Sequence, residues 1–365
     1  MKELREQHNV WSLEEKVAFL SRPEAYPDVA GRVEAKQTHR SWIFLTATHA
    51  WKLKKPVRTE YLDFSTPDAR RRDCVKEVRL NRRLARDVYR GVVPLTADGQ
   101  PQASRPSPGA PARWLSRRPL PEGEGLQLNG SGQPVDWLVC MRRLPSDRML
   151  DEVIARRAVD EEDVLRLASL LAGFYKRSVP VRIAGPEYRR RLAAHLESAR
   201  NELLKPEYRL PSNVVEDTGF ELEFLRQNQA LFDNRVQAGK IIDAHGDLRP
   251  EHICLEPCQP VIIDCLEFNR NLRILDAVSE ITFLALECER LGAPNIGRLI
   301  LNKYSEETGD RPSEKLLAFY KSYHACVRAK IAVWHLKDNG IRDRDTWITK
   351  ATDYLSVVST VTKAA

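Results

Sequence analysis

The chain has 365 residues, more than one compact core usually holds, so two lobes or domains are expected. Its 58 basic and 51 acidic side chains give a net charge of +7, but residues 40–120 hold 18 basic and 7 acidic residues, whereas residues 216–290 hold 7 and 15. This asymmetry argues against a nucleic-acid partner and favours a basic lobe suited to polyphosphate and an acidic lobe suited to metal, although solvated helix faces explain most individual charges equally well.

The cysteines and the start of the chain indicate the compartment. Seven scattered cysteines do not form a disulfide framework and indicate a reducing environment, so a cytoplasmic location is expected. The first residues lack the apolar core of a signal peptide, and no run approaches the roughly 18 apolar residues that span a bilayer, so no membrane is expected. Cys254 and Cys258 lie near His252 and Cys265, but their spacing matches no common zinc pair, so ordinary buried cysteines are expected.

Strands and one helix are predicted for the first part of the chain. The hydroxyl, proline and acid of Ser65-Thr66-Pro67-Asp68 form a helix start, and the helix should run to about residue 85. Residues 97–135 are rich in Pro, Gly, Ser and Gln and predict a long hairpin connection or insertion. Aromatic and β-branched residues predict strands at 41–46, 50–54, 92–95 and 137–141.

Helices dominate the second part of the chain. A hairpin of short extended segments, around 241–243, 253–255 and 261–264, is expected to interrupt them. Apolar residues spaced by three and four predict helices at 160–177, 186–204, 217–237, 277–291, 313–337 and 345–360.

The most informative motif is the octet His245-Gly246-Asp247-Leu248-Arg249-Pro250-Glu251-His252, followed twelve residues later by Asp264. A histidine, an aspartate that can serve as base, a polar residue five positions on and a second aspartate after a short strand are the parts of a phosphoryl-transfer site. This order of elements predicts an α+β, bilobal protein-kinase-like fold. Its β-rich N-lobe, residues 1–143, would bind nucleotide, and its mainly helical C-lobe, residues 144–365, would carry the catalytic loop, metal site and acceptor pocket.

The octet resembles the catalytic loop of the aminoglycoside phosphotransferase family, in which His-Gly-Asp takes the place of the His-Arg-Asp of protein kinases. Four further motifs resemble a bacterial subgroup of that family that is often fused to a P-loop kinase domain. No Gly-x4-Gly-Lys-Ser/Thr motif occurs, so no such partner domain is expected here. The resemblance covers roughly residues 34–290 and includes Thr38-His39-Arg40-Ser41-Trp42, Trp51-Lys52-Leu53-Lys54-Lys55-Pro56-Val57, Leu62-Asp63-Phe64-Ser65 and Ile263-Asp264-Cys265-Leu266-Glu267-Phe268.

This resemblance implies roles for the residues of the octet. Asp247 would be the base or orienter of the attacking hydroxyl, because positioning and charge neutralisation lower the barrier to phosphoryl transfer. His245 would order the loop by hydrogen bonds, and Arg249 would meet a phosphate or Glu251.

The resemblance also implies a magnesium site. Asp264 would bind a Mg²⁺ ion that bridges the nucleotide phosphates. His252 stands where the family has a metal-binding asparagine, and imidazole is a softer donor that suits magnesium poorly. Whether His252 binds metal is therefore open, with Glu267 or Glu251 as alternative oxygen donors.

In the first lobe, Ala50-Trp51-Lys52 resembles the Ala-x-Lys pattern, in which the alanine packs near adenine and the lysine reaches the phosphates. Lys54 lies on the same strand face as Lys52 and would take the role if the register differed. Glu77 would be the ion-pair partner of the lysine.

The residues expected to contact adenine and the phosphates follow the family pattern less closely than Ala50-Trp51-Lys52 does. Met141-Arg142-Arg143-Leu144 is placed like a hinge whose backbone would pair with adenine. No glycine-rich loop precedes the strand pair, so backbone groups, Thr38 or Ser41 would hold the phosphates.

The favoured function is an ATP- or GTP-dependent, magnesium-dependent kinase that acts on a hydroxyl of a small molecule, such as an aminoglycoside-like compound, a sugar or an amino alcohol. The acidic segment favours a cationic acceptor only weakly. A nucleotide-binding pseudokinase or regulatory module and a kinase with a protein substrate remain alternatives. A metal-dependent phosphoesterase would need an earlier Asp-x-His and a later Gly-Asn-His, which are absent. The sequence does not predict the oligomeric state.

Overall fold

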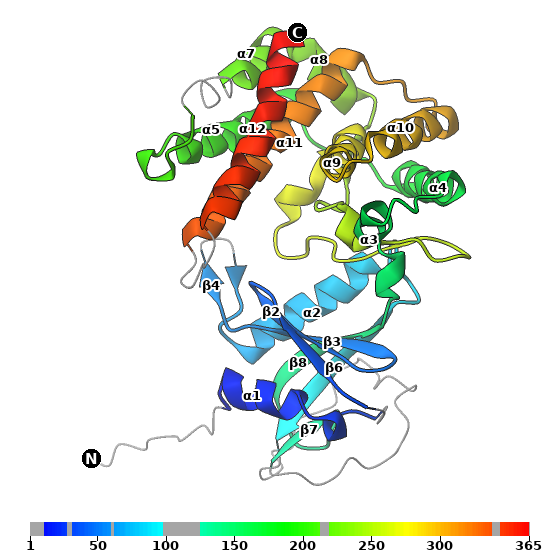
Figure 1. The fold of residues 1–365 in the computed structure, drawn as a ribbon, viewed down its shortest axis with the longest axis vertical. Coiled ribbons are helices and arrows are strands. Elements are labelled where there is room, and N and C mark those ends of the chain that lie inside the picture. Colours follow the sequence, from blue (N-terminus) through cyan, green and yellow to red (C-terminus); the bar gives the residue numbers. More distant parts are fainter. Residues whose placement is uncertain are drawn as a thin grey trace. The chain divides into compact units, whose positions relative to one another are not determined.

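The computed structural model describes residues 11–27, 31–59, 62–97, 125–211, 219–337 and 344–364. Contacts between residues divide the chain into two compact units. The first comprises Met1–Ser146 and Ile262–Asn269, and the second comprises Asp147–Val261 and Arg270–Ala365. The α+β prediction is confirmed, because the first unit contains the main sheet and the second is mainly helical (Figure 1).

An antiparallel six-stranded sheet forms the body of the first unit, with the strand order β1-β2-β3-β8-β6-β7 (Figure 1). The four predicted strands are confirmed as β2, β3, β6 and β8, and β1 was not predicted. Its residues are all exposed and have no alternating apolar pattern to reveal them. The strands are β1 (Glu34–Gln37), β2 (Ser41–Leu45), β3 (His49–Lys54), β6 (Tyr89–Ala97), β7 (Leu126–Leu128) and β8 (Gln133–Arg142), with a separate pair β4 (Arg58–Thr59) and β5 (Leu62–Asp63).

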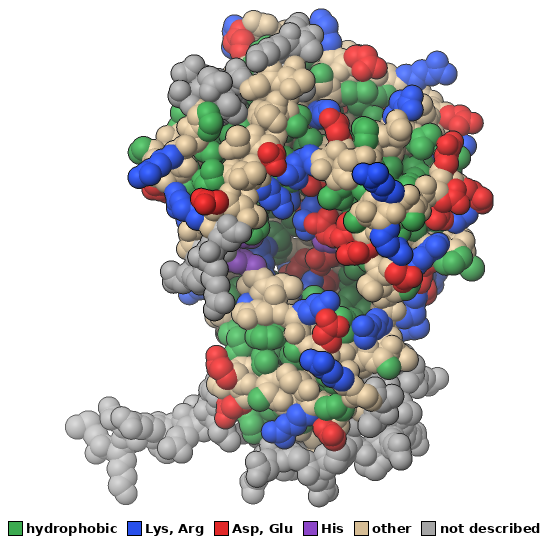
Figure 2. Space-filling view, viewed as in Figure 1, with side chains coloured by type: hydrophobic (Ala, Val, Ile, Leu, Met, Phe, Trp, Pro, Cys, Tyr) green, Lys and Arg blue, Asp and Glu red, His purple; other side chains and the backbone are tan. Residues whose placement is uncertain are grey.

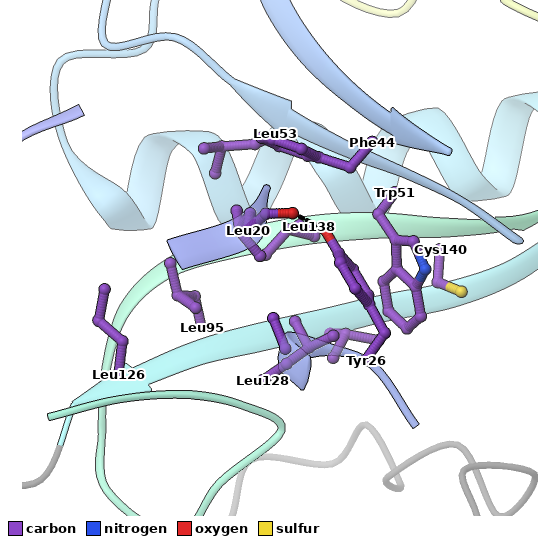
Figure 3. Close-up of a cluster of buried hydrophobic side chains, with 12 residues drawn as sticks. Leu20, Tyr26, Phe44, Trp51, Leu53, Leu95, Leu126, Leu128, Leu138 and Cys140 are labelled. Carbon is purple, nitrogen blue, oxygen red and sulfur yellow. Dashed lines mark hydrogen bonds between the residues drawn. The ribbon is translucent and has the colours of Figure 1, made fainter. Parts of the chain in front are cut away.

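Strand β3 presents two chemically different faces. Trp51 and Leu53 are fully buried in an apolar cluster to which Leu20 at the end of α1 (Leu13–Leu20) also belongs (Figure 3). In this cluster the centre of the Tyr26 ring lies 5.4 Å from that of Trp51. Because side chains alternate along a strand, Lys52 and Lys54 share the opposite face. That face packs against α2 (Pro67–Asn81), which contacts β8 and β6.

Helix α2 begins as predicted and ends earlier than predicted. The hydroxyl of Thr66 accepts a hydrogen bond from the Ala69 amide at 3.2 Å, and Pro67 is the first helical residue. The helix ends at Asn81, not near residue 85, because the following residues form tight turns such as Leu84 N–H to Asn81 O at 3.0 Å. Of the predicted insertion at 97–135, residues 98–124 lie outside the described residues, and β7 and the start of β8 occupy its end.

The second unit confirms the predicted helices with three differences. The helix predicted at 217–237 is two helices, because Asn228 has a non-helical backbone and its side chain caps the Phe224 carbonyl at 3.0 Å. Residues 217 and 218 lie outside the described residues, and neither α3 nor α10 was predicted. The last turn of the helix predicted at 313–337 is a 3₁₀ helix. The helices are α3 (Leu150–Ala155), α4 (Glu161–Arg177), α5 (Gly185–Leu203), α7 (Phe220–Gln227), α8 (Gln229–Gln237), α9 (Ala277–Arg290), α10 (Pro294–Thr308), α11 (Glu314–Trp334) and α12 (Arg344–Ala364).

Short strands flank the octet. β9 (Ile241–Asp243) pairs with β12 (Ile274–Asp276), whereas β10 (Ile253–Cys254) and β11 (Val261–Ile262) form the predicted hairpin. Short 3₁₀ helices occur at η1 (Pro23–Ala25), η2 (Ser146–Arg148), η3 (Pro206–Tyr208), η5 (Pro250–His252), η6 (Arg270–Arg273) and η7 (His335–Lys337).

The structure can be compared with the expectations for the cysteines and for membrane-spanning helices. All seven cysteines are free thiols, and Cys258 is exposed, so the expectation that it is buried is wrong. It lies in the polar turn between β10 and β11, where a side chain points to solvent. Within the described ranges, no helix has both the length and the apolar character that crossing a bilayer requires.

Candidate active site

Lys52 lies at the centre of the charged face of β3. Its ammonium is 2.9 Å from Glu77 Oε1 on α2 and 2.7 Å from Asp264 Oδ1. Burial lowers the pKa of Lys52, but the charges of Asp264 and Glu77 outweigh it and hold the pKa well above its ordinary value. The structure therefore brings together the lysine, glutamate and second aspartate that were predicted from separate parts of the sequence.

Lys54 makes a second and more buried cluster on the same face. Its side chain is 1% exposed, and its ammonium lies 2.8 Å from Asp73 Oδ2, 2.6 Å from Glu77 Oε2 and 2.6 Å from Glu267 Oε1. Burial lowers its pKa, yet the three carboxylates raise it well above the ordinary value. Glu77 thus bridges Lys52 and Lys54, one with each carboxylate oxygen.

The acids around Lys54 differ in their affinity for protons. Burial raises the pKa of Asp73 to about 6, because the nearby Glu267 and Glu77 charges add to the effect and Lys54 only partly offsets it. Burial also acts to raise the pKa of Glu267, but Lys54 and Lys52 together lower it below its ordinary value. Asp73 therefore takes up a proton at a higher pH than an ordinary aspartate does.

The segment that carries Asp264 has an unusual backbone. Asp264 has φ +60°, in the left-handed region that costs a non-glycine residue about 1–3 kcal/mol. Its amide donates to the Tyr89 hydroxyl at 3.1 Å, and the next amide, of Cys265, donates to Asn81 Oδ1 at 2.8 Å. These two hydrogen bonds keep the strained turn in place and leave the Asp264 side chain 44% exposed.

The residues predicted to contact adenine and phosphate lie on neighbouring strands and turns. Ala50 in β3 pairs with Met141 in β8. Arg143 follows β8, and its amide and guanidinium donate to the carbonyls of Thr48 and Thr46 at 2.8 and 2.7 Å. Arg143 therefore closes the turn between β2 and β3.

The phosphate-holding residues suggested by the sequence lie in a tight turn. The Thr38 hydroxyl accepts from the Ser41 amide at 3.0 Å and donates to the Ser41 carbonyl at 3.0 Å. Ser41 is buried. The turn from Thr38 to Ser41 thus takes the place of the missing glycine-rich loop between β1 and β2.

In the second unit, Glu280 of α9 holds the loop that contains His245 and Asp247. Its side chain accepts from the amides of Gly246 at 2.6 Å and His245 at 3.2 Å, and from the Tyr175 hydroxyl at 2.9 Å. Glu280 is 1% exposed, so these charge-assisted hydrogen bonds are shielded from water. Gly246 has φ +86°, which suits a residue without a Cβ atom.

Asp247 is half-buried and its carboxylate lies beside the other polar residues of the octet. Arg249 Nε is 3.0 Å from Asp247 Oδ1, and Arg249 also pairs with Glu251. His252 Nδ1 donates to the Asp247 backbone carbonyl at 2.8 Å, and His252 Nε2 accepts from Arg249 at 3.1 Å. The amide of Asp247 in turn donates to Nδ1 of the buried His245 at 3.3 Å. Hydrogen bonds and ion pairs within residues 245–252 thus surround Asp247.

The predicted metal ligands suit magnesium to different degrees. Magnesium is usually held by one or two carboxylates together with water and substrate phosphates, so a single part-exposed carboxylate such as Asp264 fits it. His252 fits it less well, because both its ring nitrogens have partners. In the described part of the chain no group of three or more His, Cys, Asp or Glu side chains is arranged to hold a metal ion.

Asp276 anchors the base of α9. It makes two 2.7 Å hydrogen bonds with Arg235, which also pairs with Asp310, and it caps α9 through the Val278 amide at 3.0 Å. The contact of α9 with the catalytic loop comes from Glu280, one turn further on. Sequence reasoning missed Glu280, although a glutamate in the apolar run that begins at Ile274 is a usable signal, since buried acids are normally paired.

The architecture defines the class. The chain has the protein-kinase-like fold of the aminoglycoside phosphotransferases and choline kinases. It matches the GDP complex of aminoglycoside 2'-phosphotransferase-IIIa with a TM-score of 0.54, 13% identity and coverage of 93% of this chain and 95% of that one. It matches a choline/ethanolamine kinase family protein from Mesorhizobium loti with a TM-score of 0.51, 14% identity and coverage of 96% and 99%. A choline kinase from Cryptosporidium parvum gives a TM-score of 0.51, 11% identity and 96% coverage of both chains.

Curated proteins give a narrower comparison. The chain is 30% identical over 305 residues to the uncharacterized proteins Rv2004c of Mycobacterium tuberculosis and Mb2027c of Mycobacterium bovis. The match covers 82% of this chain and 54% of each relative, so the chain spans about half the length of the curated relatives it matches. No family model matches the sequence.

Proposed function

We propose that this protein is a phosphotransferase that moves the γ-phosphoryl group of a nucleoside triphosphate to a hydroxyl of a small molecule. The observation that carries the proposal is the conjunction of two clusters in a kinase-like fold. One is Lys52 with Glu77 and Asp264, and the other is the His245–Asp247 loop held by Glu280. The sequence order and spacing of these groups match the parts that phosphoryl transfer needs.

In this proposal Asp247 orients the acceptor hydroxyl and takes its proton. A bond forms between the acceptor oxygen and the γ-phosphorus, the bond from the γ-phosphorus to the β–γ bridging oxygen breaks, and the nucleoside diphosphate leaves. Asp247 then releases the proton to water, which restores the carboxylate. Arg249 contacts the carboxylate of Asp247 and His252 donates to its backbone carbonyl, so we assign His252 a positioning role.

Lys52 binds the α- and β-phosphates, and Glu77 keeps its ammonium in place. Asp264 is the residue that would hold magnesium, which when bound neutralises charge on the phosphate oxygens. In this proposal Ala50, Met141 and Arg143 line the base of the nucleotide, which agrees with the pairing of Ala50 and Met141 on neighbouring strands. A GDP complex among the structures that share the fold supports a nucleotide cofactor, with ATP and GTP both as candidates.

The proposed class of acceptor rests on the comparison with solved structures of the same fold. The structures with this fold include an aminoglycoside phosphotransferase and choline kinases, so a hydroxyl on an aminoglycoside-like compound, a sugar or an amino alcohol is proposed. The length of the curated relatives leaves room for a further domain in proteins of this kind, and the activity proposed here is that of the kinase-like part.

The test is magnesium-dependent release of ADP or GDP by purified protein, with and without a panel of aminoglycosides, sugars and amino alcohols. Acceptor-stimulated release should fall at least a hundredfold in Asp247→Asn, with nucleotide binding largely retained, because only transition-state positioning is lost. Turnover that is unchanged by the substitution would remove Asp247 from the reaction. Nucleotide binding without turnover on any acceptor would instead favour a pseudokinase or a protein substrate.

A further inference from the structure

Helix α9 links the catalytic loop to a second charged cluster in the same unit. Glu280, which holds the loop, is followed seven residues later by Glu287, so the two lie on one face of the helix about 10 Å apart along its axis. Arg290 is a further three residues on and also lies on this face. The face of α9 that meets the catalytic loop therefore continues into a region with its own charges.

Three helices meet at this cluster. Glu287 of α9 accepts from the Tyr354 hydroxyl of α12 at 2.6 Å and from Arg328 Nε of α11 at 3.1 Å. The guanidinium of Arg290 lies 3.8 Å from the centre of the Tyr354 ring. Tyr354 and Glu287 are buried, so both arginines are held by groups that are themselves fixed.

Lys350 adds a third cation to the cluster. It precedes Tyr354 by four residues on α12 and so projects from the same face of that helix. Burial lowers the pKa of Lys350, and the neighbouring charges of Arg328 and Arg290 act in the same direction, against Glu287 and Glu251. Among the described residues its ammonium has no hydrogen bond or ion pair and lies 5.4 Å from the centre of the Trp347 ring.

The cluster adjoins the proposed base. Burial lowers the pKa of Arg328, but Glu287, Tyr354 and Asp247 raise it above its ordinary value. Glu251 of the octet acts on Lys350 in the same way. Helix α9 packs against Pro250–His252 at the end of the octet, so the cations on its face lie near that loop. Figure 2 shows basic side chains gathered between α12 and α9, next to acidic ones. Arg328 and Arg290 share Glu287, and Arg290 also lies 3.8 Å from the exposed Asp353, so Lys350 is the cation of this cluster that is open to an added anion.

We propose that Arg328, Arg290 and Lys350 form an oxyanion subsite for a phosphate or carboxylate group on the hydroxyl-bearing acceptor. The subsite rests on the proposed function, because it takes Asp247 as the group that meets the acceptor hydroxyl. The subsite predicts that the acceptor is an anionic hydroxy compound, such as a sugar phosphate or a sugar acid. The excess of acidic residues in 216–290 would not by itself suggest such an acceptor.

The experiment is calorimetric titration of the full chain without nucleotide, using inorganic phosphate, glucose 6-phosphate, glucuronate and glucose. At least one anion should bind ten times more tightly than glucose, and Lys350→Met should weaken that binding at least tenfold. Lys350→Arg should retain it within about threefold, since the charge is kept. The control Lys315→Met makes the same charge change at an exposed position of α11 and should leave binding unchanged.

Each outcome of these titrations either supports or overturns the proposed anion subsite. A preference for glucose 6-phosphate over glucuronate assigns the subsite to phosphate, and the reverse assigns it to carboxylate. Anions that bind no better than glucose, or that bind equally well to wild type and Lys350→Met, overturn the subsite. Because these titrations require no turnover, a protein that binds the anion and transfers no phosphate would keep the subsite and reject the proposed function.

Discussion

The two units hold their candidate functional residues in different ways. In the first unit, Lys52 and Lys54 are held by other charged side chains, and Glu77 contacts both of them. In the second, the loop of the octet is held through its backbone by Glu280, and Asp247 contacts Arg249 and His252. A change of charge in the first unit therefore disturbs every member of the cluster, whereas the loop of the second unit can lose a reactive side chain and keep its shape.

The largest effect is expected when a cation is removed from the first unit. Lys54→Met should lower the free energy of unfolding by about 3–5 kcal/mol, because it leaves buried carboxylates without their cation. Lys55→Met, the adjacent and part-exposed lysine, is the control and should cost less than about 1 kcal/mol. Urea unfolding measures both. Equal losses would show that the first unit does not depend on its charge cluster as described.

A pH-dependent effect tests the protonation of the same cluster. The folded protein holds a proton on Asp73 up to about pH 6, whereas the ordinary pKa is 3.8, so the folded state binds more protons between these values. This group should therefore lower the free energy of unfolding by about 2.4 kcal/mol as the pH rises from 4 to 7. Asp73→Asn should lack that loss. Parallel stability curves for the two proteins from pH 4 to 7 would contradict the assignment.

The anchor of the second unit should have a smaller effect on stability and a visible effect on function. Glu280→Gln keeps one acceptor oxygen but loses the charge that strengthens the hydrogen bonds to Gly246 and His245, so unfolding should become easier by about 2 kcal/mol. Hydrogen exchange at the two amides should accelerate, with turnover reduced. Asp247→Asn is the comparison, since it should reduce turnover and leave exchange at these amides unchanged.

The smallest effect separates the two lysines of the first unit. Lys52→Ala should weaken nucleotide binding at least tenfold, about 1.4 kcal/mol, because Lys52 contacts both Glu77 and the part-exposed Asp264. Lys54→Ala should weaken it less in the fraction that remains folded. Titration with a fluorescent nucleotide gives the ranking, and the reverse order would transfer the phosphate-binding role to Lys54.

Local patterns made much of this structure predictable. Strand periodicity put Lys52 and Lys54 on one face of β3, and the octet with Asp264 indicated the kinase-like fold. Glu77 was predicted from its position on the following helix and does contact Lys52. In each case the residues that carry the information are close in sequence or have a fixed spacing.

Other contacts were not predictable because they join residues far apart in sequence. Nothing near Lys54 in the chain indicates that Glu267 will reach it, and nothing near His245 indicates Glu280. The break between α7 and α8 depends on one asparagine, Asn228, and the spacing of apolar residues does not predict it.

The first unit is built from two separate stretches of chain, which the ribosome synthesises at different times. Residues 262–269, which contain Asp264 and Glu267, join contacts otherwise confined to the first 146 residues. On a ribosome, Lys52 and Lys54 emerge some two hundred residues before these two acids do. The nascent first unit therefore has to wait for most of the second to be translated before its charge cluster is complete, and a fragment ending near residue 146 should not reproduce it.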